Sequence, residues 1–218
     1  MEKFHQLRIE KVLTTFHIKE KTNCLQLDEL LLVNGSVNAF EEATLDAALD
    51  RYYRLSRGWN EEELKMQFIS SIINMVDPNV VDTCKTFFER PLEGIINNYK
   101  LHVITDCMIA SYDEGGNPQK PYFFLQEFKQ KQLWGKTDPQ GQMLAAMLLA
   151  QDKNADGEYL YGCFVKENNW RFTTLLGLDY CVSRQYDSTQ KPDLLQIVFI
   201  LRKLKELILR RFDGSIIL

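Results

Sequence analysis

A carboxylate and an ammonium group stand two residues apart in an otherwise apolar stretch of the chain. Residues 122–130 have the sequence YFFLQEFKQ, whose aromatic residues favour a β-strand. In a strand, Glu127 and Lys129 project from one face and Phe128 projects from the other. Two charges on a buried strand cost free energy unless they pair with each other or bind something. The stretch therefore indicates either a ligand site or a cross-strand ion pair at a sheet edge.

A single acid also interrupts the apolar stretch that comes before it. Asp106 lies in the sequence ITDCMIA, where Ile104 and Met108 share its face of a predicted strand. If this strand pairs with 122–130 as a hairpin across the turn DEGGNPQKP, Asp106 approaches Glu127 laterally. Two such carboxylates repel and raise each other's pKa unless a cation lies between them. Mg²⁺ or Mn²⁺ would meet that need, and the alternative is that Asp106 hydrogen-bonds to the backbone near a turn.

A third acid falls on the apolar face of a predicted helix at residues 60–76. Asn60 is a good N-cap, and the apolar residues that follow recur at helical spacing until Pro78 ends the pattern. On this helix Glu61 lies within the apolar face, next to Lys65. An inward-facing acid at the start of a core helix is a second candidate for chemistry. The alternative is that it only complements the positive end of the helix dipole, together with the two glutamates that follow it.

The surrounding elements must position these residues. The hydrophobic pattern predicts a mixed order of helices and strands: helix 60–76, two strands within 92–111, strand 122–130, helix 139–151, a hairpin of 160–166 and 171–176, and helix 193–211. Before them we expect a weak strand at 13–19, a short apolar run at 30–33 and a helix at 41–56. No Pro/Gly/Ser linker separates the two parts, so 1–58 is expected to be an appendage packed on the same body as a domain of residues 59–218.

These motifs in this order resemble the PD-(D/E)XK nuclease-like (restriction endonuclease-like) superfamily. The resemblance is carried by Glu61 on a leading helix, Asp106 on a strand, Glu127-x-Lys129 on the next strand, and Gln142 on the helix after it. It covers roughly residues 59–176, and helix 193–211 is additional. It implies an α/β (α+β) fold with an αβββαβ core, in which helices flank a central mixed sheet. Thr105 departs from the pattern, since it stands where the motif's proline would be.

The resemblance also implies a role for each residue. Asp106, Glu127 and the backbone carbonyl of Phe128 would hold Mg²⁺ or Mn²⁺, and Glu61 would bind a second ion or a metal-bound water. Lys129 would orient or deprotonate the attacking water. Gln142 would steady the nucleophile or the backbone, unless it only hydrogen-bonds within its helix.

The implied function is metal-dependent hydrolysis of phosphodiester bonds in nucleic acid, DNA in the first instance, by an endo- or exonuclease. The alternative is a catalytically inactive nuclease-like fold that acts as a regulatory protein or as a protein that binds nucleic acid or another protein. Residues 1–63 hold 8 Lys and Arg against 12 Asp and Glu, so a protein partner or a second copy of the chain could dock on this acidic region. The basic stretch 191–211 permits contact with nucleic acid but does not argue for it, and a solvated helix face is the preferred explanation.

Composition excludes several other classes of protein. Of the 218 residues 45% are hydrophobic and 26% are charged, which is ordinary for a globular chain. The longest apolar run, 143–150, is far too short to span a membrane. Three histidines are too few for a histidine-rich metal site, and no G-x-S-x-G motif or Cys/His pair indicates another hydrolase. The five cysteines are widely spaced and form no CxxC pair, so we expect reduced thiols and a cytoplasmic location.

Overall fold

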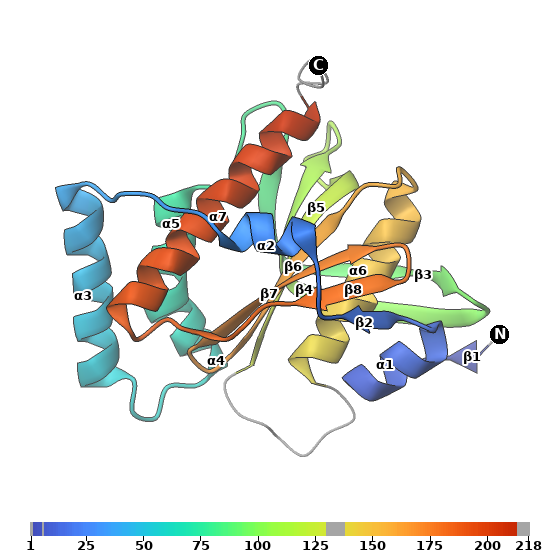
Figure 1. Cartoon of the computed structure of the whole chain (residues 1–218), viewed down its shortest axis with the longest axis horizontal. Coiled ribbons are helices and arrows are strands. Elements are labelled where there is room, and N and C mark those ends of the chain that lie inside the picture. The colour runs from blue at the N-terminus through green and yellow to red at the C-terminus, as the bar shows by residue number, and fades with distance from the viewer. Residues whose placement is uncertain (1, 6, 130–137, 213–218) are drawn as a thin grey trace.

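The chain folds around one central β-sheet with helices on both faces (Figure 1). The computed structural model describes residues 2–5, 7–129 and 138–212, without the side chains of Lys129 and Phe212. Within these residues nine strands form one sheet in the order β1-β4-β5-β6-β7-β8-β2, with β3 paired to β4 and β9 paired to β7. The strands are β1 (Glu2–Lys3), β2 (Lys19–Lys21), β3 (Lys85–Ile96), β4 (Tyr99–Tyr112), β5 (Pro118–Lys129), β6 (Leu160–Lys166), β7 (Asn169–Leu176), β8 (Asp179–Val182) and β9 (Tyr186–Asp187).

The middle of this sheet contains the strands that the sequence predicts, although β3 begins at Lys85 and not at the predicted residue 92. Strands β3, β4 and β5 form an antiparallel meander, and β6 then lies parallel to β5. A parallel neighbour requires a crossover connection, which here contains helix α6 (Pro139–Asn154). The chain is therefore a mixed α/β protein with a central mixed sheet flanked by helices, as expected.

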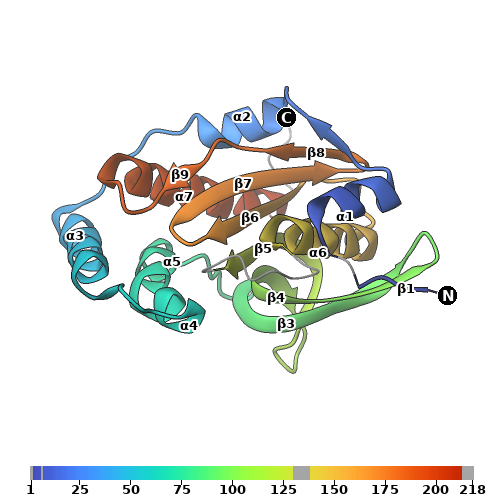
Figure 2. The same cartoon turned by 90° about the horizontal axis from the view of Figure 1, so that it is seen from below.

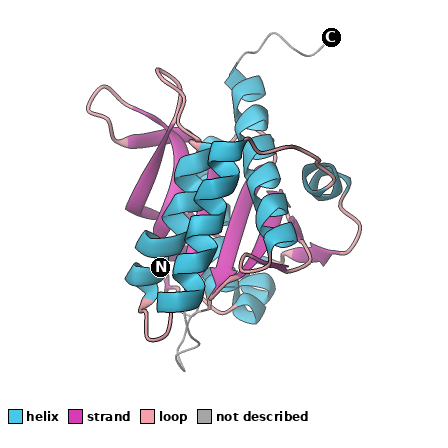
Figure 3. Cartoon of the chain, turned by 90° about the vertical axis from the view of Figure 1, so that its left-hand side faces the viewer, coloured by secondary structure: helices cyan, strands magenta, loops and turns pink. Residues whose placement is uncertain are grey.

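Two hydrophobic clusters hold the helices against the two faces of the sheet. Helices α1 (Ile9–Phe16) and α6 pack on one face, where Phe16, Met143 and Leu149 are buried with residues of the strands. The other face carries the remaining helices, shown in Figures 2 and 3: α2 (Leu25–Leu31), α3 (Ala39–Leu55), α4 (Glu61–Leu64), η1 (Lys65–Ile69), α5 (Ser70–Val76) and α7 (Lys191–Phe212). The core is thus two layers with the sheet between them.

The helix predicted at 60–76 is one uninterrupted helical run with a π-helical segment in its middle. The side chain of Asn60 accepts a hydrogen bond from the Glu63 amide, while Glu63 accepts one from the Asn60 amide, which is a capping box. The run then passes from α4 through η1 into α5. Leu64, Phe68 and Ile72 are buried along it, in the same hydrophobic cluster as Cys107 of β4 and Phe128 of β5.

The N-terminal part differs from the expectation at 13–19. This segment was predicted as a strand, but α1 extends to Phe16 and only β2 follows it, after a left-handed His17. The physical reason is that Ile9, Val12 and Phe16 recur at helical spacing, so the apolar face extends back beyond Leu13. Residues 1–58 also contribute to the sheet itself, because β1 pairs with β4 and β2 pairs with β8.

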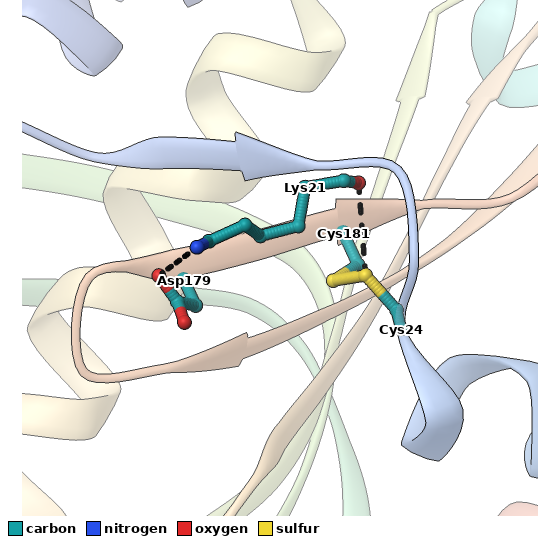
Figure 4. Close-up of a disulfide and its surroundings, with 4 residues drawn as sticks. All are labelled: Lys21, Cys24, Asp179 and Cys181. Atoms are coloured by element: carbon teal, nitrogen blue, oxygen red, sulfur yellow. Dashed lines mark hydrogen bonds and ion pairs between the residues drawn. A yellow bond between two sulfur atoms is a disulfide. The ribbon is translucent and has the colours of Figure 1, made fainter.

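A disulfide joins Cys24 to Cys181, which corrects the expectation of reduced thiols throughout (Figure 4). The cause lies in the sheet: β2 pairs with β8 so that Lys21 stands opposite Cys181, and Cys24 follows three residues later at the start of α2. An ion pair of 3.5 Å between Lys21 and Asp179 lies beside the bond. The cytoplasmic location was predicted because the cysteines were expected to be reduced, and the disulfide removes this reason for the prediction.

Candidate functional site

Three acids stand at one level of three adjacent strands. Cys107 in β4 pairs with Phe88 in β3 and with Gln126 in β5. One further step along both registers places Asp106 between Glu89 on one side and Glu127 on the other. The hairpin of β4 and β5 therefore brings Asp106 and Glu127 to adjacent positions, at the end of their paired region.

Asp106 is buried and held from two sides. Its residue is 9% exposed, and its Oδ2 accepts a hydrogen bond of 2.7 Å from the backbone amide of Phe128. Its Oδ1 lies 3.4 Å from the Lys65 Nζ, which donates to it. The backbone hydrogen bond considered as an alternative is thus present, but its donor belongs to the Glu-x-Lys segment and not to a turn.

Lys65 is the centre of an acidic cluster that the sequence analysis did not assemble. Its Nζ lies 2.5 Å from Glu62, 3.4 Å from Glu89, 3.4 Å from Asp106 and 3.7 Å from Glu61. Burial acts to lower the pKa of Lys65, but the hydrogen bond to Glu62 and the charges of Asp106, Glu62 and Glu61 raise it well above its ordinary value. The ammonium group therefore stays charged and links the leading helix to β3 and β4.

Local backbone structure places these groups. The capping box at Asn60 fixes where the helix begins, and Lys65 follows Glu61 by one turn on the same side. In β3, Glu89 adopts a left-handed backbone with φ 50°, which is strained for a residue with a side chain. The Thr105 hydroxyl donates to the Arg90 carbonyl across this kink at 3.1 Å. A backbone conformation of this kind persists only where the surrounding structure holds it in place.

Glu127 is the most deeply buried acid of the row. It is 1% exposed, whereas its neighbours Gln126 and Phe128 project to the opposite face of β5. Burial first, and then the charges of Asp106 and Glu127, raise the pKa of Cys107 to about 12. Both carboxylates thus act on the same thiol, which agrees with the adjacent positions that the strand register gives them.

The remaining predicted residues are placed in part. Lys129 pairs through its backbone with Lys166 at the end of β5, and its side chain lies outside the described residues. Gln142 lies in the first turn of α6, half-buried, and its Oε1 has no hydrogen-bond partner in the part of the chain that is described. The structure brings Glu61 and Asp106 together through Lys65. Among the described residues, no hydrogen bond or ion pair joins Gln142 to Lys65 or Asp106.

The donor set fits a hard divalent cation that keeps part of its water shell. Across residues 2–5, 7–129 and 138–212 no group of three or more His, Cys, Asp or Glu side chains is arranged to hold a metal ion. Asp106 and Glu127 supply two carboxylates, and Mg²⁺ is commonly held by one or two, with waters and substrate phosphate oxygens completing its shell. The chemistry of these oxygens suits Mg²⁺ or Mn²⁺ and does not suit a structural zinc site.

No protein-family model matches the chain, and a search of the curated proteins finds no relative. In the described residues no helix is both long and apolar enough to cross a bilayer. Function is therefore argued from the site itself. Among the residues around Lys65, no site role was predicted for Lys65 itself, for Glu62 or for Glu89. The position of Lys65 beside Glu61 was a usable signal, whereas Glu89 carried none, because its place depends on a strand register and a kink.

Proposed function

We propose that the chain is a metal-dependent nuclease that hydrolyses phosphodiester bonds of nucleic acid, DNA in the first instance. The observation that carries the proposal is the placement of two buried carboxylates, Asp106 and Glu127, at adjacent positions of β4 and β5. The order of α4–α5, β3–β4–β5, α6 and β6 supports it, because it follows the αβββαβ order that the resemblance implies.

The cation would be held by Asp106, Glu127 and the backbone carbonyl of Phe128. When bound, it would stabilise the negative charge that develops on the scissile phosphate and on the leaving oxygen. Phe128 has two roles in this arrangement, since its amide already donates to Asp106 Oδ2 and orients that carboxylate. A carboxylate that is oriented before the ion arrives loses less entropy on binding it.

The basic and amide side chains would act on water and on the carboxylates. Lys129 would orient the attacking water or accept its proton, as the resemblance implies. Gln142 would hold that water or the backbone from α6, and Glu61 would bind a further water or ion. Lys65 would keep Asp106 in position through the ion pair at 3.4 Å.

One observation favours the second candidate, a nuclease-like fold that binds without cleaving. The Lys65 ammonium already gives Asp106 a cation partner, so the acidic cluster is neutralised in part without any metal. A protein that had lost catalysis could keep such a cluster for its stability alone. Metal-dependent cleavage separates the two candidates.

The test is cleavage of single-stranded, duplex and branched DNA and of RNA, with Mg²⁺ or Mn²⁺. We expect the wild type to cleave at least one substrate and Asp106→Ala to lose all cleavage, because the variant lacks one of the two carboxylates that would hold the ion beside the scissile phosphate. Lys129→Ala should keep nucleic-acid binding but cleave ~10²–10⁴-fold more slowly, the usual effect of one proton-transfer group. Lys100→Ala, at the far end of β4, is the matched control and should behave as wild type.

Absence of cleavage by the wild type on every substrate would favour the binding protein. Equal activity of the wild type and Lys129→Ala would show that this lysine has a structural role only, or that the activity comes from a contaminant.

A further inference from the structure

The face of the sheet that carries Glu127 continues into a basic cavity two strands away. Glu127 in β5 pairs with Phe164 in β6, and Phe164 pairs with Arg171 in β7. Paired residues of neighbouring strands project from the same face, so these three side chains form one row. In the same way Lys166 of β6 and Asn169 of β7 are paired and project from that face two residues further along.

A cavity of about 420 Å³ lies over the end of these rows. Its lining residues are Phe164, Lys166, Glu167, Asn169, Arg171 and Gln185. Two cations and one carboxylate face it, and the amide of Gln185 already donates to Asn169 at 2.6 Å, which orders that side of the cavity. Its volume lies within the ~300–1,000 Å³ range of small-molecule sites, and its lining is polar and net positive.

Arg171 is the residue on which an anion would depend. It is half-buried, and in the described residues no hydrogen bond or ion pair engages its guanidinium group. A guanidinium presents paired donors that match two oxygens of a phosphate, and partial burial strengthens such a contact. Phe164, which is 7% exposed, forms the apolar floor beside it.

The spacing suits a polymer better than a single phosphate. Strands lie ~4.8 Å apart, so Arg171 stands roughly 10 Å from the Glu127 position along the row. A ligand held at Arg171 while the scissile bond lies at Asp106 and Glu127 must extend across β5 and β6. A nucleic-acid strand does this, because it carries further phosphates on both sides of the bond that is cut.

The geometry points to a second binding subsite, in which Arg171 and Lys166 hold a backbone phosphate of the nucleic acid beside the one that is cleaved. This inference rests on the proposed function, because it takes Asp106 and Glu127 as the place of cleavage. It assigns to the β6–β7 hairpin the task of fixing the substrate strand across the sheet. Contacts to phosphates fix position and do not read sequence, so the subsite would act on any sequence.

The test is the binding of a fluorescently labelled single-stranded DNA, measured by fluorescence anisotropy over a range of salt concentrations. EDTA is present to remove divalent cations, so that the DNA is not cleaved during the measurement. Loss of one phosphate contact lowers the slope of log K against log salt by about 0.7. We expect Arg171→Gln to weaken binding about tenfold with that change of slope, and Arg171→Gln with Lys166→Gln to change the slope about twice as much. Arg171→Lys should be intermediate, because it keeps the charge and loses the paired donors.

The matched control is Arg210→Gln, an exposed arginine of α7 on the opposite face of the sheet, which should bind as wild type. Circular dichroism and thermal unfolding establish that each variant is folded. Equal binding by Arg171→Gln and Arg210→Gln, or no binding by the wild type, would overturn the subsite. Equal competition by poly-glutamate of matched charge would also overturn it, since the cavity would then select charge and not phosphate.

The two proposals fail separately. Arg171-dependent binding without metal-dependent cleavage keeps the subsite and removes the nuclease. Cleavage by a wild type whose DNA binding does not depend on Arg171 keeps the nuclease and removes the subsite.

Discussion

Lys65 shows how one buried ammonium can organise a site made of acids. It contacts carboxylates from the leading helix, from β3 and from β4, and its side chain is only 14% exposed. Glu61 and Asp106 could be predicted from the sequence, because these acids interrupt apolar patterns. Glu89 could not be predicted, because it interrupts no apolar pattern and lies beside Lys65 in a left-handed backbone conformation. A hydrophobic period of 2 or 3.6 residues indicates which side chains share one face of a strand or helix, but it does not indicate where the backbone leaves its regular conformation.

Replacing this lysine should therefore cost stability. Lys65→Met removes the cation and leaves Asp106 buried without its ion-pair partner, so we expect a loss of about 1–3 kcal/mol in the free energy of unfolding at pH 7. Lys203→Met is the matched control, because Lys203 has one exposed partner, Glu206, and should cost at most about 0.5 kcal/mol. Urea denaturation measures both, and equal losses would show that Lys65 does not organise the acidic cluster.

At the scale of elements, prediction succeeded where a segment was long enough to show a period. Strands β4 and β5 and helices α3, α6 and α7 were predicted with small errors at their ends. Strands β1, β2, β8 and β9 have two to four residues each, and such segments exist only because a neighbouring strand pairs with them. The end of helix α1 was predicted as part of a strand at 13–19, because this segment alone is too short to separate the two periods.

The disulfide links the start of α2 covalently to β8, and its effect on stability can be measured. Cys24 and Cys181 are 157 residues apart, so the bond restricts the unfolded chain over most of its length. We expect reduction to lower the free energy of unfolding by about 2–5 kcal/mol. Dithiothreitol should lower the unfolding midpoint of the wild type and leave that of Cys24→Ser/Cys181→Ser unchanged. A wild type that is indifferent to dithiothreitol would contradict the bond.

At the scale of the whole molecule, ion pairs within the fold join the acidic N-terminal region to the basic C-terminal helix. Lys191 of α7 pairs with Asp46 and lies 3.9 Å from Glu42, and Arg202 of the same helix pairs with Glu41 at 2.5 Å. The acidic N-terminal region and the basic C-terminal helix therefore contact each other. This gives the charge of both segments an internal role, and it offers no support for the acidic region as a docking surface.

Buried tyrosine and cysteine side chains make the stability of the whole molecule depend on pH. Burial raises the pKa of Tyr180 and Tyr161 and of the Cys163 thiol. The folded state keeps these protons where the unfolded state releases them, at about pH 8.5 for cysteine and about pH 10 for tyrosine. The free energy of unfolding therefore keeps its full value below about pH 8 and decreases as the pH rises further.

Urea unfolding at pH 8, 9, 10 and 11 measures this decline. Tyr180→Phe removes one such group and should lessen the loss between pH 10 and 11 by about 1 kcal/mol. A free energy of unfolding that stays constant from pH 8 to 11 would contradict the burial of these groups.

The central claim is that Asp106 and Glu127 share one cation, and a crystal of the chain soaked in Mn²⁺ tests it most directly. The account predicts one anomalous peak with an oxygen of each carboxylate at ~2.0–2.3 Å, and no such peak in crystals of Asp106→Asn. Carboxylates more than ~8 Å apart, or Mn²⁺ bound elsewhere with none between them, would contradict the claim.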